Sequence, residues 1–399
     1  MVSVDGEPAD APLDWAGVAQ VTPRAGEDLE PLLTWLRGGR PAERRLDFPA
    51  GTALPDGRLD LCKQQVGPLG AARIAAALPR VGSDAAGPVR HLLLGTDGLG
   101  DVGADAVADG AGERGVQTLY LGCNKITAVG ACRIATRLRE SPQSVRAVWL
   151  KRNPLGAAGG SAAAELVESA PLLRTLDLVQ TGLEPTGLAE LVDALISASG
   201  SGREFERLYV GGNPLGSSGA SELARLIRSG CVAELYASAS GLGDTGARAV
   251  AEALRATPYG RVKRLSLASN GIGPLAAADL IDAAVRSGLE ALDLGRVRAA
   301  GVLAAPDNRV DAQAAALIGD ALSVAESRLA HLVLADCGIR SAEAIKLLDH
   351  LGGARTRVVL GKGIATTVRR RFSAHADGVP SPQVPGDVAA IKSVHRTVG

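Results

Sequence analysis

Aromatic side chains are scarce in this chain of 399 residues. Aromatic residues make up only 3% of the sequence and there is a single methionine, although 46% of the residues are hydrophobic. The apolar content is therefore mainly small and aliphatic, which favours thin stacked layers over a core built around large rings. The chain is too long for one ordinary core, so either two domains or one elongated repeat array is expected.

An excess of charge of either sign is also lacking. The 43 basic and 43 acidic side chains give a formal net charge of zero. Nothing global therefore points to a nucleic acid or a membrane surface as the partner. The strong preference for arginine over lysine is typical of a GC-rich bacterial genome.

The five cysteines are too few and too scattered for a metal site or a disulfide framework. None of them lies in a Cys-x-x-Cys pair or at zinc-ligand spacing, so no metal and no cofactor is predicted. The first residues lack a basic segment followed by an apolar one, and no apolar run reaches 18 residues. A reduced cytoplasmic protein without a membrane span is the expectation.

What the sequence does contain is an internal repeat. A Leu-x-Leu pattern followed by a turn and an apolar residue recurs at spacings of 27 to 40 residues. An Ala/Leu-rich stretch with helical periodicity, such as GACRIATRL or GARAVAEAL, follows the copies. Each unit thus predicts a strand, a turn and a helix, and stacking the units in parallel buries a continuous core. A recurring turn asparagine (124, 153, 213 and 270) predicts a ladder of side-chain amides that bind backbone groups.

The repeat resembles the ribonuclease-inhibitor-like class of leucine-rich repeat proteins. That resemblance implies an α/β solenoid of horseshoe shape, with parallel strands on the concave face and helices on the convex face. It also implies a protein-binding scaffold and not an enzyme. The chain lacks the abundant cysteines and the acidic character of the inhibitor itself, so ribonuclease inhibition is not carried over.

Three regions follow from the repeat. Residues 1–55 are expected to cap the array, because an array needs a polar-faced end. Residues 56–360 form about ten repeats, with an insertion at 295–307 that lengthens one of them. Residues 361–399 form a basic, Pro-containing tail that ends in AAIKSVHRTV, a segment compatible with a short docked helix.

The middle residue of each Leu-x-Leu is expected to point out from the strand face, because side chains alternate along a strand. Four of the ten aromatic residues of the chain occupy this one column: Tyr120, Trp149, Tyr209 and Tyr236. They are predicted to anchor a partner protein, since Tyr and Trp dominate interface hot spots. The alternative is that aromatic residues are there because strands favour them.

Polar residues near this column are predicted to orient the partner. In VWLKRNPLG, Lys151 and Arg152 stand where the sister copy LYVGGNPLG has two glycines, and such a pair could clamp a carboxylate or phosphate. The other predicted partner-binding residues are Asp60, Lys63, Asp177 and Asp293, with Arg296 and Arg298 from the insertion. The alternative is a set of solvated turn and loop charges.

No combination of serine, cysteine, histidine and acid is brought together by the repeat register, so no catalytic residue is predicted. An alternative function is an RNA-binding or RNA-associated factor that stacks bases on the same aromatic residues. It would hold phosphates with Lys63, Lys151, Arg152 and Arg369–Arg371. A minor alternative is a redox or catalytic role for Cys62 or Cys123, near cations that could lower a thiol pKa.

Overall fold

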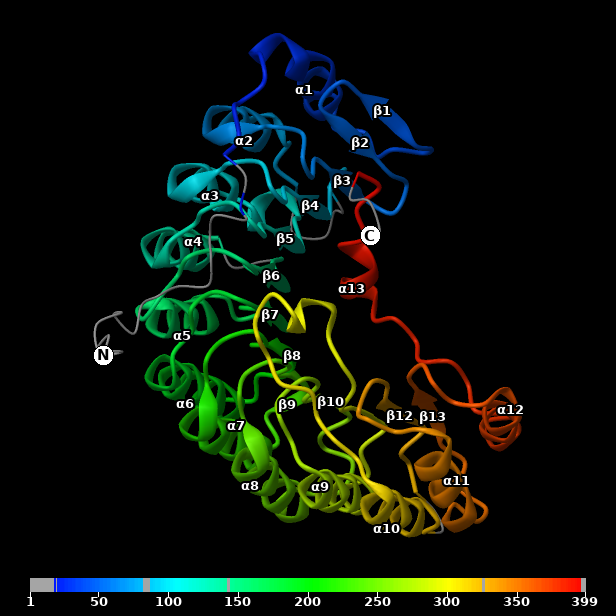
Figure 1. The fold of residues 1–399 in the computed structure, drawn as a ribbon. Coiled ribbons are helices and arrows are strands. Elements are labelled where there is room, and N and C mark those ends of the chain that lie inside the picture. The colour runs from blue at the N-terminus through cyan, green and yellow to red at the C-terminus, as the bar shows by residue number, and fades with distance from the viewer. Residues whose placement is uncertain (1–17, 19, 82–86, 142–143, 325–326, 396–399) are drawn as a thin grey trace, which may run out of the picture. The chain divides into compact units, whose positions relative to one another are not determined.

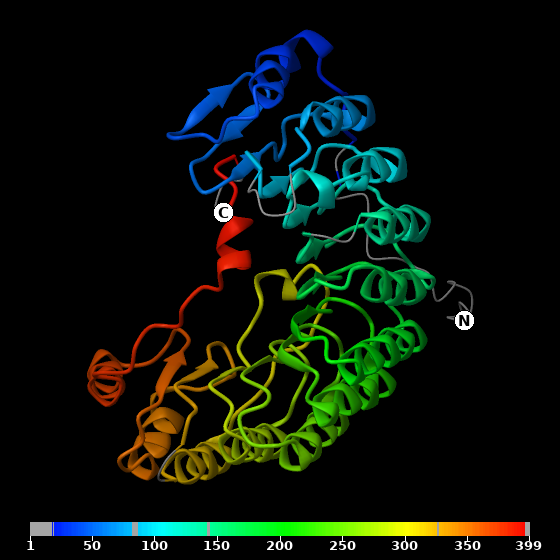
Figure 2. The same ribbon diagram turned by 180° about the vertical axis from the view of Figure 1, so that it is seen from behind.

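The computed structural model describes residues 18, 20–81, 87–141, 144–324 and 327–395. It divides into two compact units, drawn in Figures 1 and 2. Unit 1 comprises Met1–Leu183, Asp193–Arg203 and Val384–Gly399, and unit 2 comprises Glu184–Val192 and Glu204–Gln383. The boundary runs through helix α6 (Pro185–Gly200).

Unit 1 is a row of strands with helices along one side (Figure 1). The hairpin β1–β2 pairs antiparallel with β3, and β3 to β7 then pair in parallel. The strands are β1 (Leu46–Phe48), β2 (Gly51–Ala53), β3 (Arg58–Asp60), β4 (His91–Leu93), β5 (Thr118–Tyr120), β6 (Ala147–Trp149) and β7 (Thr175–Asp177). The helices are α1 (Glu30–Arg37), α2 (Gly67–Ala77), α3 (Gly100–Ala108), α4 (Ala128–Glu140), α5 (Gly159–Ser169) and the short α13 (Gly386–Ala390), with 3-10 turns at Gly26–Leu29 and Gly112–Arg114.

Unit 2 repeats the same strand–helix order, with every strand parallel to its neighbour. Its strands are β8 (Phe205–Tyr209), β9 (Val232–Tyr236), β10 (Arg264–Ser266), β11 (Ala291–Asp293), β12 (His331–Leu334) and β13 (Arg357–Leu360). Its helices are α7 (Gly216–Ser229), α8 (Gly243–Ala256), α9 (Pro274–Ser287), α10 (Ala312–Leu322), α11 (Ser341–His350) and α12 (Thr366–His375), with a 3-10 turn at Arg298–Ala300.

The core lies between the strands and the helices in each unit. The two leucine-type positions of the Leu-x-Leu pattern are buried, as for Leu119 and Leu121, which are 0% exposed. Helices pack closely because small residues face one another. A Cβ on Gly246 of α8 would come within 2.8 Å of the Cβ of Ala220 on α7, so this contact requires glycine.

At the N-terminal end of unit 1, the hairpin and α1 cover the first repeat. Leu32, Leu33 and Leu36 of α1 are fully buried, and the rings of Trp35 and Phe48 lie 5.7 Å apart. Strand β3 is thereby paired on both edges. We propose that these elements serve as the cap predicted for residues 1–55.

The predicted asparagine ladder is present. It also includes side chains beyond the four predicted asparagines. Asn153 accepts the backbone N–H of Asn124 (2.9 Å) and donates to the carbonyl oxygens of Leu121 and Leu150 (2.9 and 2.8 Å). In unit 2, Asn270 donates its own backbone N–H to the side chain of Asn308 (3.0 Å). Each side chain thus satisfies backbone groups of two successive turns, which fixes one repeat against the next.

Asp97 occupies the same ladder position without an amide to donate. Its Oδ1 accepts the backbone N–H groups of Gln64 and Val66 (2.9 and 3.3 Å), whereas its buried Oδ2 has no hydrogen-bond partner. Burial raises the pKa of Asp97 to about 8, against the opposing effect of those N–H groups. The side chain is therefore mainly neutral at pH 7.

We expect Asp97→Asn to stabilise the protein, because it restores the amide donor of the ladder. The folded-state pKa of Asp97 lies above that of the unfolded chain. Its favourable contribution is therefore complete below pH 4 and is lost as the pH rises towards 8. The gain in unfolding free energy should be small at pH 4 and on the order of 5 kcal/mol at pH 7.5. Urea unfolding at several pH values measures it, and an equal pH dependence of both proteins would contradict the assignment.

Candidate functional site

The middle residues of the Leu-x-Leu pattern form columns because the strands pair in register. In unit 1, Leu93 pairs with Tyr120, Tyr120 with Trp149, and Trp149 with Asp177. In unit 2, Tyr209 pairs with Tyr236. Of the twelve predicted partner-binding residues, seven lie in unit 1 and five in unit 2.

The column of unit 1 is buried. Tyr120 is 2% exposed and Trp149 is 3% exposed, while the Asp60 and Asp177 carboxyl groups are buried as well. The expectation that these side chains stand free on the strand face is therefore wrong for this unit. The Tyr120 ring packs against Gly95, and residues 386–395 bind Asp60 and Thr175 on the same strand face.

The two cations of VWLKRNPLG have different surroundings. Lys151 is half-buried, with its Nζ 5.7 Å from the centroid of the Tyr120 ring, a cation–π distance. Burial raises the pKa of the neighbouring Asp177 to about 6, and the charge of Lys151 acts against that shift. Arg152 is exposed, and so is Lys63 in the corresponding turn of the first repeat.

Arg152 occupies a turn position that has left-handed backbone in most repeats. Its φ is 55°, and that of Gly212 at the equivalent position is 71°. Lys63, Gln180 and Ser269 adopt similar values at this position. The turn therefore favours glycine, and a residue with a side chain there carries a conformational cost of about 1 kcal/mol.

Arg152→Gly should accordingly raise the unfolding free energy by about 0.5 kcal/mol, and Gly212→Arg should lower it by about 1 kcal/mol. Thermal or urea unfolding of the two variants measures both effects. If Arg152 also orients a partner, Arg152→Gly weakens binding while it stabilises the fold. A loss of stability in Arg152→Gly would show that its side chain makes a structural contact that offsets the turn.

The column of unit 2 carries a fixed pair of aromatic rings. The rings of Tyr209 and Tyr236 stack with centroids 4.3 Å apart and an interplanar angle of 8°, and both residues are half-buried. The Tyr236 hydroxyl donates to Glu234 Oε2 (2.8 Å), which also accepts from Arg207 Nε (3.0 Å). Burial, together with the charge of Glu234, raises the pKa of Tyr236, so this hydroxyl stays protonated.

Glu234 is a buried carboxylate between two cations. Its side chain is 8% exposed, and Arg264 Nε lies 3.8 Å from Oε1, whereas Arg207 Nε binds Oε2. The cluster of Tyr209, Tyr236, Glu234, Arg207 and Arg264 is named the tyrosine cluster below. A buried carboxylate held by two arginines and a hydroxyl keeps the ring of Tyr236 in one orientation.

Glu234→Gln should lower the unfolding free energy by about 2–3 kcal/mol, because two arginines then lose their buried counter-charge. Glu206→Gln is the matched control, since Glu206 also binds Arg207 (2.8 Å) but is 47% exposed. The control should lower it by less than about 1 kcal/mol. Urea unfolding compares the two, and equal costs would show that the tyrosine cluster does not depend on the buried charge.

Two other predicted residues of unit 2, Asp293 and Arg296, contact groups close to them in the same unit. Asp293 is half-buried and accepts from Gly295 N (2.9 Å) and Ser266 Oγ (3.2 Å), and burial raises its pKa. Arg296 and Arg298 are exposed in the insertion, where Arg296 forms an ion pair with Asp307 across the base of the loop. Asn308 then takes the ladder position, so the insertion leaves the ladder intact.

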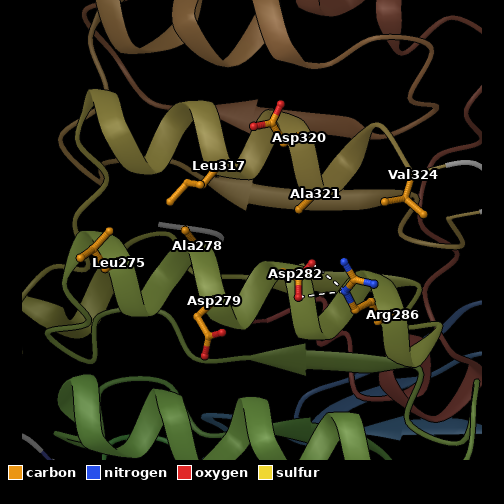
Figure 3. A pocket seen from close by; sticks show the side chains of 9 residues that line it. All are labelled: Leu275, Ala278, Asp279, Asp282, Arg286, Leu317, Asp320, Ala321 and Val324. Atoms are coloured by element: carbon orange, nitrogen blue, oxygen red, sulfur yellow. Dashed lines mark hydrogen bonds and ion pairs between the residues drawn. The ribbon is translucent and has the colours of Figure 1, made fainter.

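A groove that the sequence did not indicate lies between α9 and α10 on the helix side of unit 2 (Figure 3). Its volume is about 390 Å³. Leu275, Leu317 and Val324 form an apolar part of the wall, and Asp282 at the rim is paired with Arg286 (2.8 Å). Leu275 and Leu317 are exposed leucines outside the buried stripe of their helices. Their position is the feature that could have indicated the groove.

Glu234 was also missed, although its position could have been found. It lies two residues before Tyr236 in β9 and therefore shares its face. Across the described residues, no group of three or more histidine, cysteine or acidic side chains could hold a metal ion. Cys62 is buried and Cys123 is half-buried. None of the helices described is long and apolar enough to cross a membrane.

No family model matches the sequence. Among solved structures, the leucine-rich repeat-containing protein LegL7 from Legionella pneumophila is 13% identical, with a TM-score of 0.48, over 92% of this chain and 99% of that chain. Rad7 in the yeast Rad7–Elc1 complex is similar at 12% identity, with a TM-score of 0.45 and 86% of each chain covered. The tropomodulin C-terminal domain of Caenorhabditis elegans is 12% identical, with a TM-score of 0.31, over 40% of this chain and 91% of that chain.

These likenesses are too distant to carry function. The class follows from the structure itself, in which strand, turn and helix recur in order with a buried side-chain ladder in the turns. The chain is an α/β leucine-rich repeat solenoid.

Proposed function

We propose that this protein is a non-enzymatic, cytoplasmic scaffold of the ribonuclease-inhibitor-like type that binds a partner protein on its strand face. The observation that carries the proposal is the tyrosine cluster of unit 2. Two stacked rings, half-exposed and held by a buried carboxylate, form a rigid amphipathic surface. Such a surface loses little conformational entropy on binding, which is why tyrosine is frequent at hot spots.

The charges around the rings favour a partner with both apolar and polar groups. Arg264 is 25% exposed in its side chain and Arg207 is 12% exposed, so Arg264 is the more accessible cation of the cluster. Glu206, at 47% exposure, adds a negative charge at the same edge. A mixed rim around an aromatic centre is the usual anatomy of a protein-binding surface.

The geometry is less favourable for RNA. The inner faces of Tyr209 and Tyr236 are stacked on each other, and Tyr120 and Trp149 are buried, so few ring faces are available for bases. Of the three tail arginines, Arg369 donates to the carbonyl oxygens of Gly361 and Ile364. These contacts favour a protein over RNA as the partner.

The test is binding of the partner captured from the native host by wild type and by a Tyr209→Ala/Tyr236→Ala variant. We expect the double substitution to raise the dissociation constant at least 30-fold, which corresponds to a loss of about 2 kcal/mol in binding free energy. Tyr259→Ala is the matched control, because Tyr259 is 59% exposed in the same unit and lies outside the tyrosine cluster. It should change affinity less than threefold.

Unchanged binding by the double variant that retains its fold would remove the proposal. A captured RNA whose affinity falls steeply with salt would replace it by the RNA alternative. An affinity for a protein that changes little with salt supports it.

A further inference from the structure

The strand face of unit 1 already holds a ligand from the same chain. Residues 386–395, here named the C-terminal segment, lie on the side of β3–β6 opposite to α2–α5 (Figures 1 and 2). Arg58 Nη1 donates to the carbonyl oxygen of Lys392 (2.6 Å), and the hydroxyl of Thr52 lies 3.2 Å from His395 Nε2. The segment and these strand residues belong to the same compact unit.

Asp60 is the main polar contact of the segment. Its carboxylate is fully buried and accepts both the Ser393 hydroxyl (3.0 Å) and the Val394 backbone N–H (2.5 Å). The Cys62 backbone N–H is a further donor (3.1 Å). A buried carboxylate at the middle position of a repeat is thus satisfied partly by residues more than 300 positions later in the chain.

A second contact lies at the other end of the segment. The Thr175 hydroxyl on β7 donates to Asp387 Oδ2 (2.6 Å). Because β4, β5 and β6 lie between β3 and β7 in the strand order, the segment passes over the strands that carry Tyr120 and Trp149. The position of the segment is consistent with the burial of Tyr120 and Trp149.

The segment presents both buried and exposed side chains. Ala390 is the buried residue of α13, while Lys392 is exposed and Val394 is 41% exposed. Its hydrogen bonds to Arg58, Asp60 and Thr175 each contribute about 1 kcal/mol. A chain-terminal segment with exposed side chains opens at a lower free energy than strands packed on leucines.

We infer that the strand face of unit 1 is a peptide-binding surface and that the C-terminal segment is its intramolecular ligand. The chemistry that it recognises is a hydroxyl and a backbone N–H for Asp60, with a carboxylate six residues earlier for Thr175. Where the proposed scaffold function holds, a partner that reaches Asp60, Tyr120 and Trp149 must present matching groups and displace this segment. The face is therefore closed until the segment leaves.

Peptide binding tests the surface directly. A fluorescent peptide of residues 384–395 is titrated against the full chain and against a chain that ends at Gln383, with fluorescence anisotropy as the readout. We expect it to bind the shortened chain, and to bind the full chain at least tenfold more weakly, because the tethered copy competes at an effective concentration near millimolar. The same peptide with Ser393→Ala and Asp387→Ala should bind the shortened chain at least tenfold more weakly. A folded shortened chain that does not bind the peptide would overturn the inference.

Hydrogen exchange of the full chain gives an answer even if the shortened chain does not fold. We expect amides of residues 391–395 to exchange at least tenfold faster than those of β5. Asp387→Ala should increase the exchange rate of the segment's amides further, without changing the exchange rate of the β5 amides. Asp377→Ala is the matched control, an exposed carboxylate ten residues earlier, and should change neither. Exchange of the segment and β5 at one common rate would show a permanent part of the fold and contradict the inference.

The two proposals can fail separately. Loss of partner binding in Tyr209→Ala/Tyr236→Ala concerns unit 2, whereas peptide binding concerns unit 1. If the peptide does not bind but the double tyrosine variant loses its partner, the scaffold function is supported. The intramolecular ligand is then contradicted.

Discussion

The buried side-chain ladder in the turns is the constraint on which the other features depend. Each turn between strand and helix carries backbone N–H and C=O groups that neither element binds, and they lie where water cannot reach them. Asn153 and Asn308 satisfy these groups in the preceding repeat, at the turns of Asn124 and Asn270. Each repeat therefore completes the one before it, which explains why the strands pair in register.

That register decides which side chains meet on the strand face. It places Tyr120 beside Trp149 and Tyr209 beside Tyr236, so residues from different repeats form one surface. It also brings carboxyl groups into places with little water, and burial raises the pKa of Asp97, Asp177 and Asp293. Each of these acids is bound by turn amides or hydroxyls, which accounts for its burial.

The twin segments VWLKRNPLG and LYVGGNPLG differ for a local reason and a tertiary one. The turn needs a left-handed residue, which Gly212 supplies easily and Arg152 supplies at a cost. Lys151 lies against the Tyr120 ring, whereas the corresponding Gly211 lies against the backbone of Ser238. The frame of the repeat could be predicted from the spacing of the leucines, but the neighbours of each variable position could not.

The sequence by itself determined the repeating strand, turn and helix, the buried leucines and the asparagine ladder, because these depend on spacing within one repeat and on its nearest neighbour. Only the tertiary structure decided that Arg207 of β8 binds Glu234 of β9 and that Ser393 and Asp387 lie on the face containing Asp60. Those contacts join residues from different strands or from opposite ends of the chain. No periodicity encodes such a pairing, because it depends on where the chain returns after the last repeat.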